Sequence, residues 1–302
     1  MRITTKMMTS NFQRNLNNNL VNMQQLYNQV NTGKLISKPS DNPFLATRIM
    51  DYNTEITRKE QFERNLDDVK GFMDMTDTVA GQVTDQMNRI KELTTKASSG
   101  TNSASDLAII ATEVDEIMAT MVDTLNTSFE DKYIFGGTET SQKPFELVNG
   151  NITYQGNEEK TKVEIAKGVY IDRNITGTEI LGGITVTGEA QSYNLFDSLN
   201  SISEALKNND QAKLTSLTSH VDDHLDNILK VRGKVGAVQQ RIDLTIDKTK
   251  DEILNLTELL SSKEDADLAE KYIEYTSLQT SYMASLQISS QIIQPSLLDF
   301  LK

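Results

Sequence analysis

The two histidines of the chain lie four residues apart, in the sequence His220-Val221-Asp222-Asp223-His224. On a helix this spacing places both imidazoles on one face, where they could bind zinc. A zinc protease of the His-Glu-x-x-His type needs a glutamate directly after the first histidine, and valine stands there instead. No third histidine and no cysteine is present to complete a ligand set. We therefore expect an ordinary solvated helix face here and no metal site.

Other motifs that could support catalysis also have the wrong spacing. Gly233-Lys234-Val235-Gly236 lacks the Gly-x-x-x-x-Gly-Lys-Ser/Thr order that binds phosphate. Neighbouring acids such as Asp67 and Asp68 point away from each other on a helix, so they make poor acid–base pairs. The absence of cysteine excludes disulfides and thiolate chemistry. We expect no catalytic residue, no cofactor site and no enzymatic activity.

The charge of the chain is unevenly distributed along its 302 residues. The net charge is −13, yet residues 1–40 contain five basic residues and no acid, and the first acidic residue is Asp41. An acidic chain offers no basic face for nucleic acid, so we expect no such partner. No run of about 18 apolar residues is present, which predicts no membrane insertion. No cleavable secretory signal is visible either, so export would need another route.

The hydrophobic pattern predicts long helices interrupted by a β segment. Only 37% of the residues are apolar, which suits helices that each bury a narrow stripe. The expected helices cover residues 4–32, 44–97, 104–129, 193–207, 210–260 and 267–293. Turn residues between short alternating runs predict hairpins around Asn149-Gly150-Asn151 and Lys167-Gly168. The fold class is mainly α with a small inserted β domain, built as elongated antiparallel helical rods with terminal coiled-coil helices.

This layout predicts three domains. Residues 1–43 and 264–302 would form a terminal coiled-coil assembly domain. Residues 44–132 and 191–263 would form a helical rod domain, and residues 133–190 would form the inserted β domain. Pro39 and Pro43 exclude a continuous helix where the first two domains meet. We therefore expect Pro39, Ser40, Asp41 and Pro43 to act as a hinge.

The two end helices carry apolar stripes at alternating steps of four and three residues. Six apolar anchors on the last helix contribute roughly 9–18 kcal/mol if fully buried. Ordering about thirty residues costs on the order of 1–2 kcal/mol each, so the ends should need neighbouring subunits. The expected assembly contacts are Phe12, Leu16, Met23, Leu26, Val30, Leu268, Tyr272, Tyr275, Tyr282, Leu286, Ile293, Leu297, Leu298 and Phe300.

Several short segments, taken in order, resemble the flagellin superfamily and, within it, the hook–filament junction proteins of the hook-associated type. They lie in the terminal regions and flank the β segment. The matching segments are Met1-Arg2-Ile3-Thr4, Thr32-Gly33-Lys34, Lys38-Pro39-Ser40-Asp41-Asn42-Pro43, Ala46-Thr47-Arg48, Tyr133-Ile134-Phe135-Gly136-Gly137-Thr138, Pro144-Phe145 and Gln294-Pro295-Ser296-Leu297-Leu298. The β segment itself carries almost none of the resemblance.

The resemblance implies a structural subunit of the bacterial flagellum, exported without a cleaved signal and located outside the cell. Implied partners are copies of itself in a ring, the other hook–filament junction protein, flagellin, and a cytoplasmic export chaperone that binds the C-terminal helix. Filament-forming flagellin is the alternative, because its ends look similar. A surface adhesion module that binds a ligand through residues 140–190 is the second alternative. The junction interpretation predicts instead that the β segment tolerates replacement.

Overall fold

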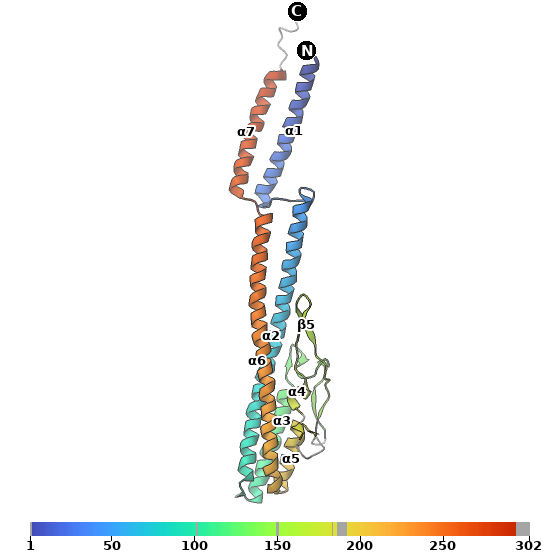
Figure 1. The fold of residues 1–302 in the computed structure, drawn as a ribbon, viewed down its shortest axis with the longest axis vertical. Coiled ribbons are helices and arrows are strands. Elements are labelled where there is room, and N and C mark those ends of the chain that lie inside the picture. The colour runs from blue at the N-terminus through green and yellow to red at the C-terminus, as the bar shows by residue number, and fades with distance from the viewer. Residues whose placement is uncertain (1, 101, 149–150, 183, 186–191, 294–302) are drawn as a thin grey trace, which may run out of the picture. The chain divides into compact units, whose positions relative to one another are not determined.

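The computed structural model of the chain describes residues 2–100, 102–148, 151–182, 184–185 and 192–293 (Figure 1). Its helices are α1 (Arg2–Thr32), α2 (Pro43–Ser98), α3 (Ala104–Leu125), α4 (Gly177–Leu181), α5 (Leu195–Lys207), α6 (Gln211–Glu264) and α7 (Leu268–Ile293). Its strands are β1 (Ser128–Phe129), β2 (Lys132–Tyr133), β3 (Phe145–Val148), β4 (Asn151–Tyr154), β5 (Lys162–Ala166), β6 (Val169–Asp172), β7 (Ile184–Thr185) and β8 (Ser192–Tyr193). The strands form four two-stranded antiparallel sheets, β1–β2, β3–β4, β5–β6 and β7–β8, among the described residues. The expected class, mainly α with a small β part, is confirmed.

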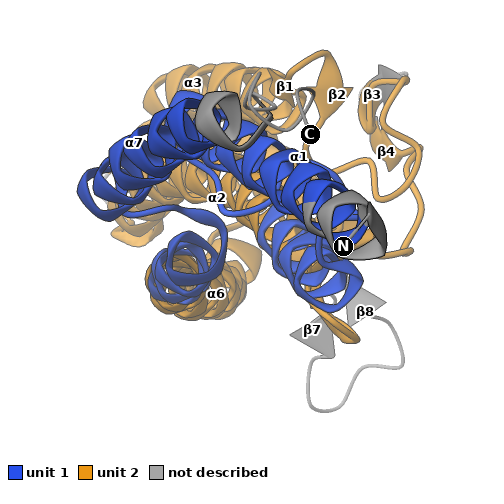
Figure 2. Cartoon of the chain, turned by 90° about the horizontal axis from the view of Figure 1, so that it is seen from above, with its two compact units in different colours: residues 1–58, 251–302 blue, residues 59–250 orange. Residues whose placement is uncertain are grey.

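The chain forms two compact units (Figure 2). Unit 1 comprises residues 1–58 and 251–302, and unit 2 comprises residues 59–250. The boundaries between these units fall inside α2 and α6. The division into three domains stays a prediction. Within the described helices, none combines the length and apolar character needed to cross a membrane.

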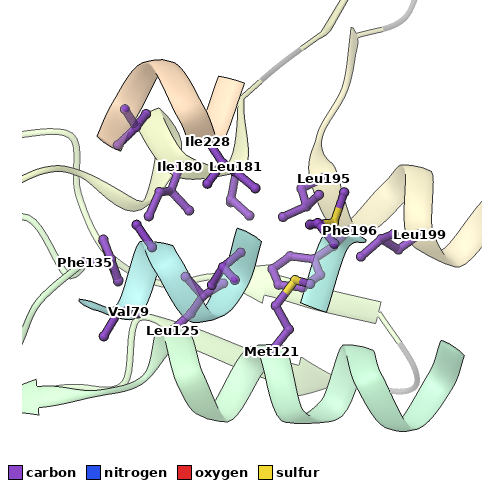
Figure 3. Close-up of a cluster of buried hydrophobic side chains, with 14 of the residues drawn as sticks. Val79, Met121, Leu125, Phe135, Ile180, Leu181, Leu195, Phe196, Leu199 and Ile228 are labelled. Carbon is purple, nitrogen blue, oxygen red and sulfur yellow. The ribbon is translucent and has the colours of Figure 1, made fainter. Parts of the chain in front are cut away.

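The hydrophobic core of unit 2 is shared between helices and the β segment. Figure 3 shows Phe135, Ile180 and Leu181 packed with Met121, Leu125, Phe196 and other side chains from the helices. Phe145, Ile165 and Ile171, from β3, β5 and β6, belong to the same buried cluster. Two-stranded sheets cannot bury a core of their own. The β segment is therefore stabilised by packing on α2, α3, α5 and α6.

The helix starts of unit 2 follow their capping residues. Ser103 and Asp106 form the expected capping box at the start of α3, and Asn194 and Asp197 form another at α5. The sequence pattern extended α3 to residue 129, but the helix ends at Leu125. The reason is Asn126, whose side chain bonds both backbone polar groups of Phe145, at 2.8 and 3.0 Å. Side-chain bonds of this kind compete with helix continuation.

Phe129 explains why a glycine lies in the middle of α2. The Phe129 ring sits over Gly71, where an added Cβ would come within 3.1 Å of the ring. The same ring meets Phe72 edge-on, with centroids 6.2 Å apart. A glycine inside a helix weakens the helix by about 1 kcal/mol relative to alanine. Here the glycine allows an aromatic ring to approach the backbone closely.

Polar pairs connect α2 and α6 along unit 2. Lys70 bonds Asp243 at 2.6 Å, and Lys91 bonds Asp222 at 2.7 Å. Three further pairs lie along the same two helices: Arg232–Asp77 at 3.1 Å, Gln239–Asp74 at 2.8 Å and Lys250–Glu63 at 3.8 Å. Each exposed pair contributes little stability. Along the series, the residue number on α6 falls as the residue number on α2 rises. The pairs therefore specify one antiparallel register between the two helices.

Both expected hairpins are present. Val148 pairs with Asn151 between β3 and β4, and Ala166 pairs with Val169 between β5 and β6. Gly168 has φ +74°, a conformation that glycine adopts without strain. The hairpins β1–β2 and β7–β8 and the short helix α4 were not expected from the sequence. Each spans five residues or fewer per element, which is too short for a periodic pattern.

Candidate assembly surface

Unit 1 is built around the antiparallel pair α1 and α7 (Figure 1). The apolar stripe expected on α1 is half-buried along its whole length. The rings of Tyr27 and Tyr275 meet across the pair, with centroids 6.2 Å apart. The half-buried stripe residues of α1 are Phe12, Leu16, Met23, Leu26 and Val30. None of the side chains described on α1 is fully buried.

The stripe expected on α7 divides into two sets. Tyr275 and Tyr282 are half-buried, together with Leu278, which the pattern had not included. Leu268, Tyr272 and Leu286 remain exposed, at 51%, 58% and 45%. Ile293 is the last residue of α7, and Leu297, Leu298 and Phe300 lie outside the described residues. Periodicity located the apolar side of α7, while the partner helix determined which part of it is covered.

Exposed apolar residues are concentrated in unit 1, and buried apolar residues are concentrated in unit 2. Among the described residues, 19 large hydrophobic residues are exposed, and 14 of these belong to unit 1, although unit 2 is the longer unit. In the buried core the distribution reverses, because Ala46 and Ile49 are the only members from unit 1 among the described residues. Exposed apolar surface concentrated in this way marks a site of association. Unit 1 is therefore the candidate assembly surface.

Backbone hydrogen bonds connect the two chain segments that link the end helices to α2 and α6. The N–H of Leu35 donates to the carbonyl of Glu264 at 2.7 Å, and that of Ala266 donates to Gly33 at 2.8 Å. Lys34 and Asp265 form the β-bridge between these bonds. Lys34 also forms an ion pair with Glu264. Hydrogen bonds thus join residues 33–35 to residues 264–266 at the base of the helix pair, where α1 ends and α7 begins.

The expected hinge residues lie in an ordered turn. The carboxylate of Asp41 accepts hydrogen bonds from the N–H groups of Ser37 and Lys38, at 3.2 and 3.0 Å. Asn42 caps α2 by accepting from the N–H of Leu45 at 3.1 Å. Pro43 occupies the first helical position, where its missing N–H has no consequence. Pro39 and Ser40 lie within the turn and are exposed. Whether the segment bends in function stays a prediction.

Charged residues are few and unevenly distributed in the α1–α7 pair. α1 contains no acidic residue, and α7 contains no charged residue from Tyr275 to Ile293. At the other end of α7, the hydrogen bond that Lys271 donates to Glu274, 2.9 Å long, raises the pKa of Lys271. Charge is therefore absent from most of the α7 surface and confined to its first two turns.

The rate of amide hydrogen exchange should differ between the two units. Amides of α1 and α7 are expected to exchange far faster than those of α3 and of α2 within unit 2, because partial burial leaves these helices close to local unfolding. Hydrogen exchange measured by mass spectrometry on the dilute full-length chain tests this. Equal protection in α1 and α3 would show that the pair is stable without neighbours.

His224 does not lie on a solvated face as expected, whereas His220 is half-buried. His224 is 1% exposed, and its Nε2 lies 3.0 Å from the hydroxyl of Ser198 on α5. Valine at 221, leucine at 225 and isoleucine at 228 show that this side of α6 faces the core, a signal that the sequence did contain. Throughout the described residues, no group of three or more potential ligands is placed to hold a metal. The Ser198–His224 pair is buried on both sides and offers no access to a substrate.

His224 should make the stability of unit 2 dependent on pH. Burial, together with nearby His220, lowers the pKa of His224 from 6.5 to about 4. Between these values the unfolded chain binds more protons, so stability is present above pH 6.5 and is lost as pH falls towards 4. The expected loss is on the order of 3 kcal/mol. Denaturant unfolding at pH 7 and pH 4.5 measures it, and His224→Gln should flatten the difference. An unchanged difference in that variant would contradict the assignment.

Comparison with known proteins agrees with this arrangement of end helices. A model of the bacterial flagellin N-terminal helical region matches residues 3–140, and one of the flagellin C-terminal helical region matches residues 218–301. Flagellar hook-associated protein 3 of Escherichia coli K12 is 26% identical, over 94% of this chain and 96% of that protein. Its counterpart in Salmonella typhimurium is 25% identical, over 93% and 95%. Flagellin FlaB2 of Treponema pallidum is 24% identical, over 88% and 87%.

Two solved structures share the fold. A putative flagellar hook-associated protein from Vibrio parahaemolyticus has a TM-score of 0.67 at 20% identity, covering 74% of this chain and all of that one. FlgL of Bacillus cereus has a TM-score of 0.58 at 22% identity, covering 70% of this chain and 99% of that one. Their likeness concerns the fold.

Proposed function

The chain belongs to the bacterial flagellin family, and we propose that it is a structural subunit of the flagellum that joins the hook to the filament. Two relatives that align over nearly their whole length are named hook-associated protein 3. The observation that carries the proposal is the concentration of exposed apolar side chains in unit 1. Such a unit is stabilised when neighbouring subunits cover it.

The proposed partners follow from the family and from the surface. Copies of the chain form a ring, between the other hook–filament junction protein and flagellin. A cytoplasmic export chaperone binds the exposed apolar side of α7 before export, because that side is otherwise prone to aggregation. The chain then leaves the cell by the flagellar export route without a cleaved signal. The segment from Pro39 to Pro43 provides the hinge between the end helices and α2.

A deletion strain tests the proposal. Electron microscopy should show hooks without filaments, and flagellin should be found in the medium. Expression of the full-length chain should restore filaments. If the chain were filament flagellin, the deletion would remove filaments without shedding another flagellin. Intact filaments in the deletion strain would contradict both roles.

A further inference from the structure

A groove lined by residues of α1 contains a positive charge that lacks a counter-charge. The groove is lined by Ser10, Gln13, Arg14, Leu16, Asn17 and Leu20. Leu16 is half-buried and Leu20 is exposed, so the groove has an apolar part. Neither α1 nor the part of α7 beyond Tyr275 contains an acid. Arg14 therefore has no carboxylate to neutralise it within the helix pair.

The opposite end of the pair has an excess of negative charge. Residues 258–274, which end α6 and begin α7, contain six acids against Lys263 and Lys271. Glu264 and Glu274 form ion pairs, and Asp267 caps α7 by accepting from the N–H of Glu270 at 3.2 Å. Glu270 is exposed. Ile273, one helical turn further along the same face, is 67% exposed.

The groove and the acidic start of α7 are complementary, but they cannot meet within one chain. The Tyr27–Tyr275 contact fixes the alignment of α1 with α7. From that contact, Glu270 lies five residues towards the base of the pair, and Arg14 lies thirteen residues in the other direction. At the rise of an α-helix this separates the two charges by about 27 Å.

We propose that the α1 groove of one chain binds the start of α7 of a second copy, displaced by about 27 Å along the helix pair. Arg14 then pairs with Glu270 of the second copy, and Ile273 of that copy lies at the Ser10 end of the groove, away from Leu20. The two surfaces differ, so the contact is head-to-tail and can repeat from copy to copy. This inference rests on the proposed function, since it names the surfaces through which such subunits associate.

Reciprocal charge reversal tests the contact in the full-length chain. Arg14→Glu and Glu270→Arg should each weaken self-association about tenfold, measured by sedimentation velocity over a range of concentrations. The chain that carries both changes, and an equimolar mixture of the two single variants, should recover association. Arg64→Glu and Glu116→Arg are matched controls in unit 2 that change the net charge equally, and both should leave association unchanged. High salt should reduce the effect of each reversal.

The outcomes separate this contact from the proposed function. If the single reversals leave association unchanged, or if the double reversal fails to restore it, the Arg14–Glu270 contact is wrong. The junction role survives that result provided that the deletion strain still lacks filaments. If the wild-type chain does not associate at high concentration, the Arg14–Glu270 contact is wrong. If the deletion strain also keeps its filaments, the junction role is wrong too.

Discussion

Replacing Leu286 by aspartate should abolish incorporation of the chain into flagella and should leave unit 2 folded. Leu286 is exposed in the single chain, within a stretch of α7 that contains no charge. A carboxylate that is buried between subunits without a partner costs several kcal/mol, which is enough to prevent assembly. The core of unit 2 draws on other residues, so its thermal unfolding should not change. Swimming assays, electron microscopy and circular dichroism measure the three quantities.

The matched control for this variant is Ile109→Asp. Ile109 is also a large exposed apolar residue, but it lies on α3 in unit 2. That variant should assemble normally if unit 1 carries the assembly surface. Cells that swim normally with Leu286→Asp would remove the basis for the assembly role.

Phe145→Ala is expected to lower the free energy of unfolding of unit 2 by about 3–5 kcal/mol. Phe145 is 1% exposed in β3, and its ring lies 6.1 Å from that of Phe196 on α5 and 5.3 Å from that of Tyr154 on β4. Its removal leaves a cavity between the β segment and the helices. Denaturant unfolding of the full-length chain gives the change. Tyr170→Ala, at an exposed position on β6, is the control and should have almost no effect.

A small effect of Phe145→Ala would mean that the β segment is stable independently of the helices. The structure indicates the opposite, and this changes two expectations. Free replacement of the β segment would remove buried side chains from the shared core. Residues 140–190 taken alone would likewise lose their partners, so ligand binding by that isolated segment is a poor test of adhesion.

The long helices were predictable from the sequence because their evidence is local. Ser103 with Asp106 located the start of α3, and the four-three spacing from Phe12 to Val30 located the covered side of α1. Partners far away in the sequence were not predictable in this way. Asn126 ends α3 by bonding Phe145, and His224 is buried against Ser198 on another helix. Neither contact leaves a periodic signal.

The candidate surface was predictable in kind and less so in detail. The pattern on α7 identified an apolar side that runs from Leu268 to Ile293. It could not distinguish Tyr275 and Tyr282, which lie against α1, from Leu268 and Tyr272, which remain exposed. Helical periodicity gives the direction of a side chain around its own axis, and the position of the neighbouring helix decides what that direction meets.

The polar series between α2 and α6 has a consequence for the order of folding. Its pairs join residues as far apart as Glu63 and Lys250, so the register closes only after almost the whole of unit 2 is available. Contacts of such long sequence separation slow folding, because loop closure must come before the contacts that stabilise it. A chain that emerges from a narrow passage starting at its N-terminus would remain open until α6 arrives. The same long-range pairs that fix the register of the folded unit therefore delay its folding until α6 is present.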